Sequence, residues 1–239
     1  MTMNGKSEEY EDRRRKMVDV QIERRGVDDE HVLEAMRRVP REQFVPERHR
    51  SMAYSDRPLP IGEGQTISQP YIVALMTEAA GVEPGDKVLE VGTGSGYGAA
   101  VASRIADQVY TVERHVDLAE DAERVYEELG YDNIDIVVGD GTLGFPEEAP
   151  FDAIIATASG PEVPETFKEQ VAIGGSIVMP VGSKMGGQRL TKLTKRQDGQ
   201  FDEDDMGFVR FVPLIGQRAW EESESSGASK PSEDSLFDF

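Results

Sequence analysis

The sequence predicts an α/β fold built on a doubly wound, mostly parallel sheet, and three observations favour it. From residue 85 onward, short apolar runs alternate with stretches of helical periodicity, a pattern typical of parallel sheets with crossover helices. The first run, VLEVG, leads into the glycine-dense turn TGSGYG, as in open sheets that bind a ligand at the strand ends. The last two runs alternate in period two with no helical stretch between them, which predicts an antiparallel C-terminal edge.

Residues 1–84 are expected to form N-terminal helices and a loop that covers the site, packed on the core. Their predicted elements are a helix over 8–25, a helix over 28–38, irregular structure over 44–64 and a helix beginning at Pro70. Apolar residues at helical spacing indicate the first two helices, and Pro40 ends the second. Prolines and glycines at turn-like places indicate the irregular stretch. Proline suits the first helical position, which places Ser68 or Gln69 near the N-cap.

Residues 85–220 are expected to form the core, and residues 221–239 an acidic, polar and disordered tail. Period-two or continuous apolar runs predict strands over 87–92, 108–113, 134–140, 151–157, 175–182, 188–196 and 207–214. Helical periodicity predicts helices over 97–105, 116–129 and 164–171. No internal repeat is visible.

The amino-acid composition excludes several classes of partner and of catalytic chemistry. A net charge of -20 over 239 residues repels phosphates and anionic lipid, so we expect no nucleic acid or membrane partner. Dispersed acidity indicates a high-salt cytosol, although an ordinary acidic protein remains an alternative. The absence of cysteine excludes disulfides and thiolate catalysis, and three histidines without metal-ligand spacing predict no metal site. Without a long apolar stretch or a secretory leader, the expected location is cytoplasmic.

The glycine turn is ambiguous about its ligand. Gly92, Gly94 and Gly96 satisfy G-x-G-x-G, while Gly94 and Gly96 with Ala99 satisfy the dinucleotide form. The second predicted strand ends in Glu113, about 20 residues past Gly92, where a carboxylate can accept both hydroxyls of a ribose. These features indicate an adenosine-type ligand and fit both NAD and S-adenosylmethionine.

The third strand and the chain length favour one ligand over the other. Asp140, in the GDG that ends the third strand, can accept a hydrogen bond from the exocyclic amine of adenine. A dinucleotide also needs a second mononucleotide-binding half, and the chain is short of one after GSIVMP. S-adenosylmethionine needs no such half, so the residues favour a methyltransferase over a dehydrogenase.

A series of motifs then points to one family. They are FVPE, AYSDRPLPIG, GQTISQP, VLEVGTGSGY, VVGDGTLG, APFDAIIATA, MPVG followed by GGQ, and FVPL. From Arg41 to Trp220 the chain resembles the protein-L-isoaspartate (D-aspartate) O-methyltransferases, which repair isomerised aspartyl and asparaginyl residues. GQTIS and GDGTLG are specific to that family. The resemblance looks strongest to archaeal members, and the acidity fits a haloarchaeal one. It implies a class I S-adenosylmethionine-dependent methyltransferase with a Rossmann-like core.

The resemblance also implies roles for individual residues, with Ser68 as the active-site residue. Implied contacts with S-adenosyl-L-methionine are Gln65, Thr66, Ile67, Glu90, Gly92, Thr93, Gly94, Ser95, Gly96, Glu113, Arg114, Asp140 and Gly141. Implied substrate contacts are Thr66, Ser68, Tyr71, Val181 and Gly182. The alternative for Thr66 and Ser68 is that they only cap the next helix. Tyr71 stands where vertebrate relatives have histidine, and Ser159-Gly160 replaces an alanine-rich pair, which puts the wall of the substrate groove in doubt.

The chemistry expected of this site needs no general base, because a carboxylate with a pKa near 4 is already ionised at neutral pH. Ser68 would orient that carboxylate rather than deprotonate it. The expected partners are isoaspartyl peptides and proteins, bound in extended form by a monomer. Two alternatives stay open: a methyltransferase of a different carboxylate or small molecule, and a non-catalytic S-adenosylmethionine-binding adaptor. Whether residues 182–187 close over substrate also stays open.

Overall fold

Seven strands form one sheet in the order β5-β4-β3-β6-β7-β8-β9, in a computed structural model that describes residues 3–183 and 187–221. The strands are β3 (Lys87–Val91), β4 (Gln108–Glu113), β5 (Ile134–Val138), β6 (Phe151–Ala156), β7 (Val171–Gly182), β8 (Gln188–Lys195) and β9 (Phe201–Val209). Strands β3 to β7 pair in parallel, and β8 and β9 are antiparallel. The predicted fold, a parallel sheet with an antiparallel C-terminal edge, is confirmed. The order of the last strands, which the sequence left open, is β7-β8-β9.

The last strand lies earlier in the chain than the predicted 207–214. It carries consecutive exposed acids, 202–205, which the alternation of GFVRFVPL does not include. After Val209 the chain leaves the sheet because Gln188 takes both backbone groups of Phe211: its Oε1 accepts the Phe211 N–H at 2.6 Å and its Nε2 donates to the Phe211 carbonyl at 3.1 Å. The predicted strand is therefore wrong beyond Val209.

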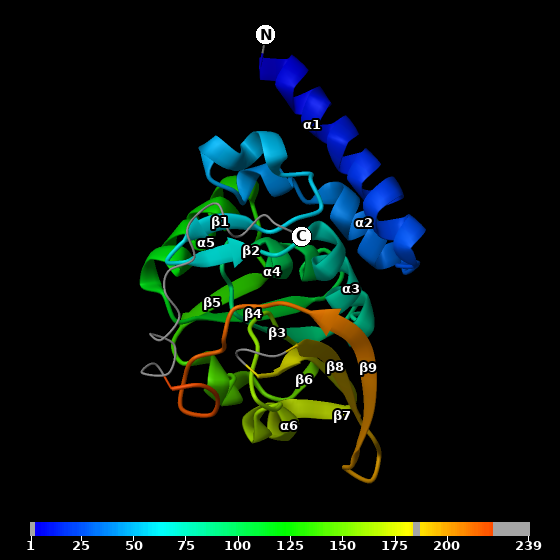
Figure 1. Ribbon diagram of the computed structural model, residues 1–239, viewed down its shortest axis with the longest axis vertical. Coiled ribbons are helices and arrows are strands. Elements are labelled where there is room, and N and C mark those ends of the chain that lie inside the picture. Colours follow the sequence, from blue (N-terminus) through cyan, green and yellow to red (C-terminus); the bar gives the residue numbers. More distant parts are fainter. Residues whose placement is uncertain (1–2, 184–186, 222–239) are drawn as a thin grey trace.

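Four helices cover the parallel sheet. They are α3 (Pro70–Ala80), α4 (Tyr97–Ala102), α5 (Val116–Leu129) and α6 (Glu165–Gln170). Helices α3, α4 and α5 lie on one face and α6 on the other (Figure 1). Because both faces are covered, a central strand such as β6 (FDAIIA) is almost continuously apolar. Helix α5 has the predicted bounds, while α4 is shorter than predicted.

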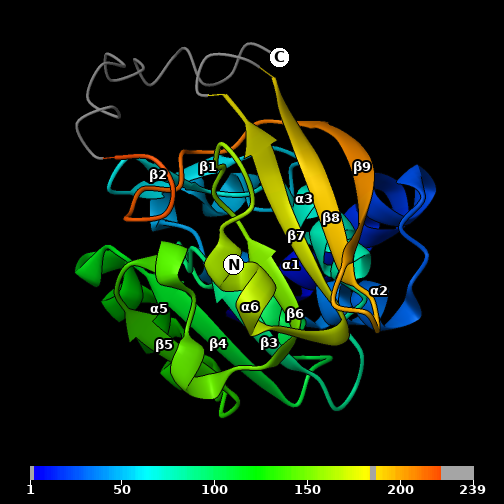
Figure 2. The same ribbon diagram turned by 90° about the horizontal axis from the view of Figure 1, so that it is seen from below.

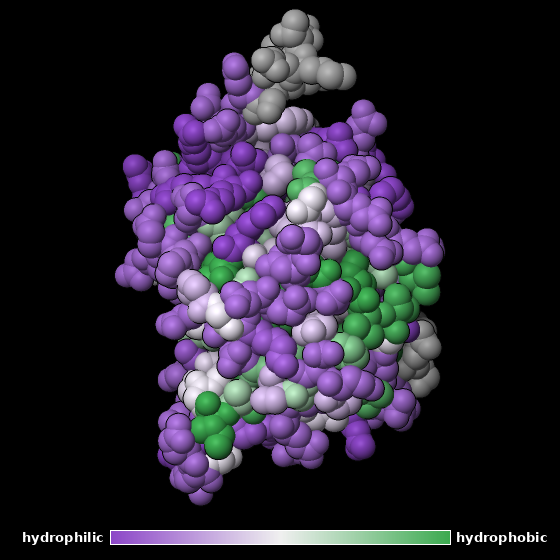
Figure 3. Space-filling model, turned by 180° about the vertical axis from the view of Figure 1, so that it is seen from behind, coloured by the Kyte–Doolittle hydropathy of each residue, from purple (hydrophilic) through white to green (hydrophobic). Residues whose placement is uncertain are grey.

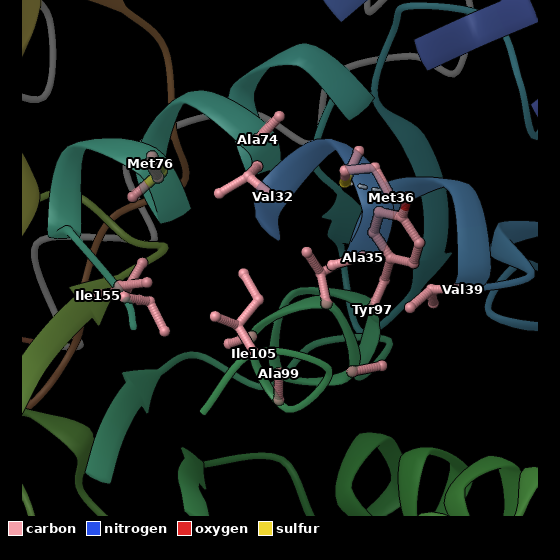
Figure 4. Packing of buried hydrophobic residues seen from close by; sticks show 14 of the residues in the cluster. Val32, Ala35, Met36, Val39, Ala74, Met76, Tyr97, Ala99, Ile105 and Ile155 are labelled. Atoms are coloured by element: carbon pink, nitrogen blue, oxygen red, sulfur yellow. Dashed lines mark hydrogen bonds between the residues drawn. The ribbon is translucent and has the colours of Figure 1, made fainter. Parts of the chain in front are cut away.

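The N-terminal segment packs on the face of the sheet that α3, α4 and α5 cover. Helix α1 (Met3–Met17) continues through a π-helical turn, Val18–Ile22, into a 3-10 turn, Glu23–Arg25. Helix α2 (Glu30–Arg38) begins after Asp29, whose side chain accepts the Val32 N–H. Buried residues of α2 and α3 meet residues of α4 and Ile155 of β6 in one hydrophobic cluster (Figure 4). This packing fixes the start of α3, and with it the loop before α3, relative to the sheet.

The stretch predicted as irregular contains a small hairpin. Two 3-10 helices, Arg41–Gln43 and Glu47–Met52, precede β1 (Leu59–Gly62) and β2 (Gln65–Ile67), which pair antiparallel. The prediction missed the hairpin because its strands are short and β1 contains a proline. The hairpin carries GQTI directly to Ser68 and places it over the sheet's carboxyl edge.

The segment after β9 crosses that same edge. Figure 2 shows it running beside the β1–β2 hairpin, at the end of the sheet toward which the β6 and β7 arrows point. Ser159, just after β6, donates its N–H to Val212 and accepts the Leu214 N–H, both at 2.8 Å. The opposite side of the molecule is covered mainly by hydrophilic side chains (Figure 3), as the net charge requires.

Candidate active site

The glycine loop joins β3 to α4 at the carboxyl edge of the sheet. Gly92, Gly94 and Gly96 all have positive φ angles, 100°, 54° and 85°, in the region that favours glycine. Space is also limited at two of them. A Cβ on Gly92 would lie 2.5 Å from the Thr157 hydroxyl, and one on Gly96 would lie 2.6 Å from the Tyr126 hydroxyl. The loop therefore packs closely against β6 and α5 and leaves its backbone at the strand ends.

Glu113 ends β4 beside this loop, as predicted. Its Oε2 accepts the N–H of Gly94 at 2.9 Å and its Oε1 accepts the N–H of His115 at 3.0 Å. Each carboxylate oxygen has two acceptor positions, so one on each oxygen is left for a ligand such as a ribose diol. The residues present fit an adenosine ligand at this point.

Glu90 lies beneath the loop rather than on its surface. The side chain is 3% exposed, and a Cβ on Gly98 would lie 2.1 Å from its Oε1. Thr111 donates to Glu90 Oε2 at 2.7 Å, and the Thr93 and Thr111 hydroxyls are 2.7 Å apart. Burial raises the pKa of Glu90 to about 8, so the carboxyl is largely protonated at neutral pH. The Thr93 hydroxyl is thus part of a buried hydrogen-bond network with Thr111 and Glu90.

Asp140 and Gly141 follow β5 at the same edge. Asp140 Oδ1 accepts the N–H and the hydroxyl of Thr142 at 2.9 and 2.6 Å. Its Oδ2 accepts the N–H of Gln217 at 2.8 Å, and a Cβ on Gly216 would lie 2.0 Å from Oδ1. The segment after β9 therefore contacts Asp140, the residue predicted to bind adenine. Oδ2 of Asp140 can still accept a further hydrogen bond.

Ser68 follows the hairpin and is half-buried. Ile67 is buried and anchors the loop. A small pocket of about 20 Å³ is lined by Ser68, Thr77, Glu90 and Thr157, together with apolar residues of α3, α4 and the sheet. Helix α3 begins with Gln69 as its N-cap residue and has no side-chain cap. The alternative, that Thr66 and Ser68 serve only to cap the helix, therefore loses its basis.

The remaining residues predicted to bind the cofactor differ in how deeply they are buried. Gln65 and Thr66 are half-buried on β2, and Gln65 Nε2 donates to the Glu63 carbonyl at 3.3 Å. Ser95 lines a cleft between α5 and residues 43–50. Arg114 is exposed beyond Glu113.

The predicted substrate residues other than Thr66 and Ser68 lie in two segments, the start of α3 and the end of β7. Tyr71 is half-buried, with the guanidinium carbon of Arg25 3.4 Å from its ring centre. Asp56 accepts the Tyr71 N–H at 3.2 Å and forms an ion pair with Arg25. At the end of β7, Gly182 donates its N–H to the Gly160 carbonyl at 3.0 Å. That N–H is therefore engaged within the protein, and peptide contacts there must use other groups. Residues 184–186 of the glycine-rich segment, and 222–239 of the tail, lie outside the described residues.

Two features of the site were not predicted from the sequence. Thr157 follows β6 and donates to the carbonyl of Gly92 at 2.7 Å, and its position at the end of a predicted central strand was a usable signal. The packing of residues 216–218 against Asp140 had no such signal, because it depends on where the chain goes after leaving the sheet.

The described part of the chain has neither a metal-binding cluster nor a membrane-spanning helix. Over residues 3–183 and 187–221, no group of three or more His, Asp or Glu side chains could hold a metal ion. No helix in those ranges has the length and apolar character needed to cross a membrane.

Comparison with known proteins gives a consistent match. A family model described as Protein-L-isoaspartate(D-aspartate) O-methyltransferase (PCMT) matches residues 12–219. The chain is 52% identical over 211 residues to Protein-L-isoaspartate O-methyltransferase of Brucella anthropi, covering 88% of this chain and 97% of that protein. It is 49% identical over 218 residues to Protein-L-isoaspartate O-methyltransferase 2 of Marinobacter nauticus, covering 91% and 100%. Both relatives are bacterial, so the expected archaeal character is not supported.

Solved structures agree with the fold. One described as a protein-L-isoaspartate O-methyltransferase aligns with TM-score 0.76 and 34% identity, covering 86% of this chain and 67% of that chain. A second, from Plasmodium falciparum, is described as a putative protein-L-isoaspartate O-methyltransferase in complex with S-adenosyl-L-homocysteine. It aligns with TM-score 0.73 and 27% identity, covering 84% of this chain and 98% of that chain.

Proposed function

The chain belongs to the protein-L-isoaspartate(D-aspartate) O-methyltransferase family, and on this basis we propose that Ser68 orients the substrate carboxylate toward the methyl donor. The protein is a repair methyltransferase that uses S-adenosyl-L-methionine on L-isoaspartyl residues of damaged proteins. The observation that carries the role of Ser68 is its place between the β1–β2 hairpin and the start of α3, where its side chain caps no helix. A hydroxyl at that place can donate a hydrogen bond to a carboxylate.

The reaction is an in-line displacement. A carboxylate oxygen forms the new bond to the methyl carbon, and the carbon–sulfur bond breaks with its electron pair moving to sulfur, giving a methyl ester and a neutral thioether. S-adenosyl-L-methionine supplies the electrophilic methyl group when bound. The nucleophile is ionised without help because its pKa lies near 4. The contribution of Ser68 is therefore to hold the oxygen close to the methyl carbon, a form of catalysis by positioning.

Other residues would hold the methyl donor. Glu113 would accept the ribose hydroxyls through the acceptor positions left free by Gly94 and His115. Asp140 would accept from the adenine amine, with Gly141 beside it. The backbone of residues 92–96 and the covering hairpin residues 65–67 would enclose the rest. Buried Glu90 would support the loop from below.

The substrate would lie between Tyr71 on one side and Val181 and Gly182 on the other. Both L-isoaspartyl and D-aspartyl residues are proposed substrates, in extended chains held with little regard for sequence. We further propose that the protein works as a monomer in a high-salt cytoplasm, without nucleic acid or membrane partners. Support comes from the net charge of -20, which opposes association with polyanions. Light scattering at near-physiological and at molar salt tests the oligomeric state.

A paired peptide assay tests the substrate class. Two peptides of identical sequence, one with L-isoaspartate and one with normal aspartate, are incubated with radiolabelled methyl donor. Base-labile methyl ester is expected on the isoaspartyl peptide only. Equal methylation of both peptides, or donor binding without turnover, would contradict the proposal in favour of a different carboxylate substrate or a non-catalytic adaptor.

A further inference from the structure

We propose that Arg41 is a positioning residue that holds the backbone of Ser68 from inside the protein and so sets the position of its hydroxyl. This inference rests on the role proposed for Ser68. The sequence motifs assigned no function to Arg41, and it does not line the small pocket that Ser68 lines.

The guanidinium of Arg41 connects three separate segments. The side chain is fully buried. Its Nε donates to the carbonyl of Ala53 at 2.8 Å, and its Nη2 donates to the carbonyl of Ser68 at 2.7 Å. Its guanidinium carbon lies 4.7 Å from the centre of the Tyr97 ring, in the first turn of α4. One rigid planar group therefore ties the loop to the N-terminal segment and to the helix after the glycine loop.

The charge of Arg41 is retained despite its burial. Desolvation lowers the pKa of Arg41 to about 10, so the group is still protonated at neutral pH. No carboxylate in the described part of the chain forms a salt bridge with it. Its Nε and Nη2 donate to backbone carbonyls, and its Nη1 is buried without a hydrogen-bond partner. Burying a cation with one nitrogen unpaired is costly. Two directional hydrogen bonds to carbonyls 15 residues apart (53 and 68) are what this arrangement supplies.

Geometry, rather than charge, is the expected contribution of Arg41 to catalysis. The reacting pair is a sulfonium cation and a carboxylate anion, so a nearby cation repels one partner as it attracts the other. The hydrogen bond to the Ser68 carbonyl acts differently, because it fixes the peptide plane that follows the Ser68 Cα. A displacement of about 1 Å at a reacting group can cost about 100-fold in rate.

Two variants separate geometry from charge. Arg41→Lys keeps the charge but cannot donate to both carbonyls in the same geometry, and Arg41→Ala removes both. We expect each to lower kcat on the isoaspartyl peptide by about 10- to 100-fold, with the dissociation constant of S-adenosyl-L-homocysteine changed by less than about threefold. Added guanidinium should restore part of the kcat of Arg41→Ala, whereas sodium chloride at equal ionic strength should not. Wild-type kcat in Arg41→Lys, or in folded Arg41→Ala, would overturn the proposal.

Asn133→Ala is the matched control. Asn133 Nδ2 also donates to backbone carbonyls, of Ser103 at 2.9 Å, Ala106 at 3.2 Å and Asp107 at 3.4 Å. These contacts lie at the amino end of β5, away from the carboxyl edge of the sheet. This variant should lose stability and keep its kcat. If Arg41→Ala fails to fold by circular dichroism, Arg41→Lys carries the test, because it keeps the charge and most of the volume.

A double-mutant cycle separates this inference from the role of Ser68. If Arg41 acts through Ser68, Arg41→Lys should lower kcat much less in a Ser68→Ala background than in the wild type. Full activity of Ser68→Ala alone would contradict the role proposed for Ser68. Impaired Ser68→Ala together with unimpaired Arg41→Lys would contradict only the role of Arg41.

Discussion

Glu113 Oε2 accepts the backbone N–H of Gly94 at 2.9 Å, so the last residue of β4 is hydrogen-bonded to the glycine loop that follows β3. The same carboxylate accepts the His115 N–H and thereby also fixes the start of α5. One side chain thus shapes the loop and offers its remaining acceptor positions to a ribose. Its removal should affect ligand binding more than the chemical step.

Glu113→Ala should weaken binding of S-adenosyl-L-homocysteine by about 10- to 100-fold, since hydrogen bonds to a charged acceptor are worth about 1.5–3 kcal/mol. Isothermal titration calorimetry measures this directly. Asp152→Ala is the control: its carboxylate accepts the Lys87 N–H at 2.9 Å at the opposite edge of the sheet, and its loss should leave the affinity unchanged. Equal affinity of Glu113→Ala and wild type would remove Glu113 from the site.

Buried Glu90 should make stability depend on pH. Burial raises its pKa from 4.5 to about 8, so between these values the folded state keeps a proton that the unfolded state has lost. The stabilisation is therefore complete below pH 4.5 and is lost as pH rises through 8. Glu90→Gln cannot ionise. Without ligand, its Tm minus that of wild type should rise by about 5 °C or more between about pH 5 and about pH 8.5.

Differential scanning fluorimetry of the two proteins across that range checks the prediction, and other titrating groups cancel in the difference. A Tm difference that stays constant with pH would mean that Glu90 titrates normally and is not desolvated beneath the loop.

The excess of acidic residues should make stability depend on salt. With a net charge of -20, self-repulsion opposes the compact state. Raising sodium chloride from about 0.1 M to about 1 M shortens the screening length from about 10 Å to about 3 Å, so Tm should rise, with most of the rise below about 1 M. A Tm that is flat or falls over this range would contradict the proposed high-salt setting.

The sequence predicted the parallel core well because local and tertiary preferences agree there. Strand β4 and helix α5 have the predicted bounds, since an apolar run or a strong helical period matches the face that each buries. The β1–β2 hairpin and the true position of β9 were missed. The exposed acidic residues of β9 have low strand propensity, so the sequence does not indicate a strand there. The strand forms because it pairs with β8 in the folded protein.

The candidate site was predictable only where a motif marks it. Glu113, Asp140 and the glycine loop converge because parallel strands end at one edge. The burial of Glu90 could not be predicted in the same way, because it depends on the packing of Gly98 against its carboxyl group. Arg41 gave no local signal, because its partners, Ala53 and Ser68, are brought to it only by folding.

The central claim concerns Ser68, and turnover of Ser68→Ala on an L-isoaspartyl peptide tests it most directly. We predict a kcat for Ser68→Ala about 10- to 1000-fold below that of the wild type. Its affinity for S-adenosyl-L-homocysteine should be nearly unchanged, and its kcat should depend on pH as in the wild type. A folded Ser68→Ala enzyme that keeps the full kcat would contradict it.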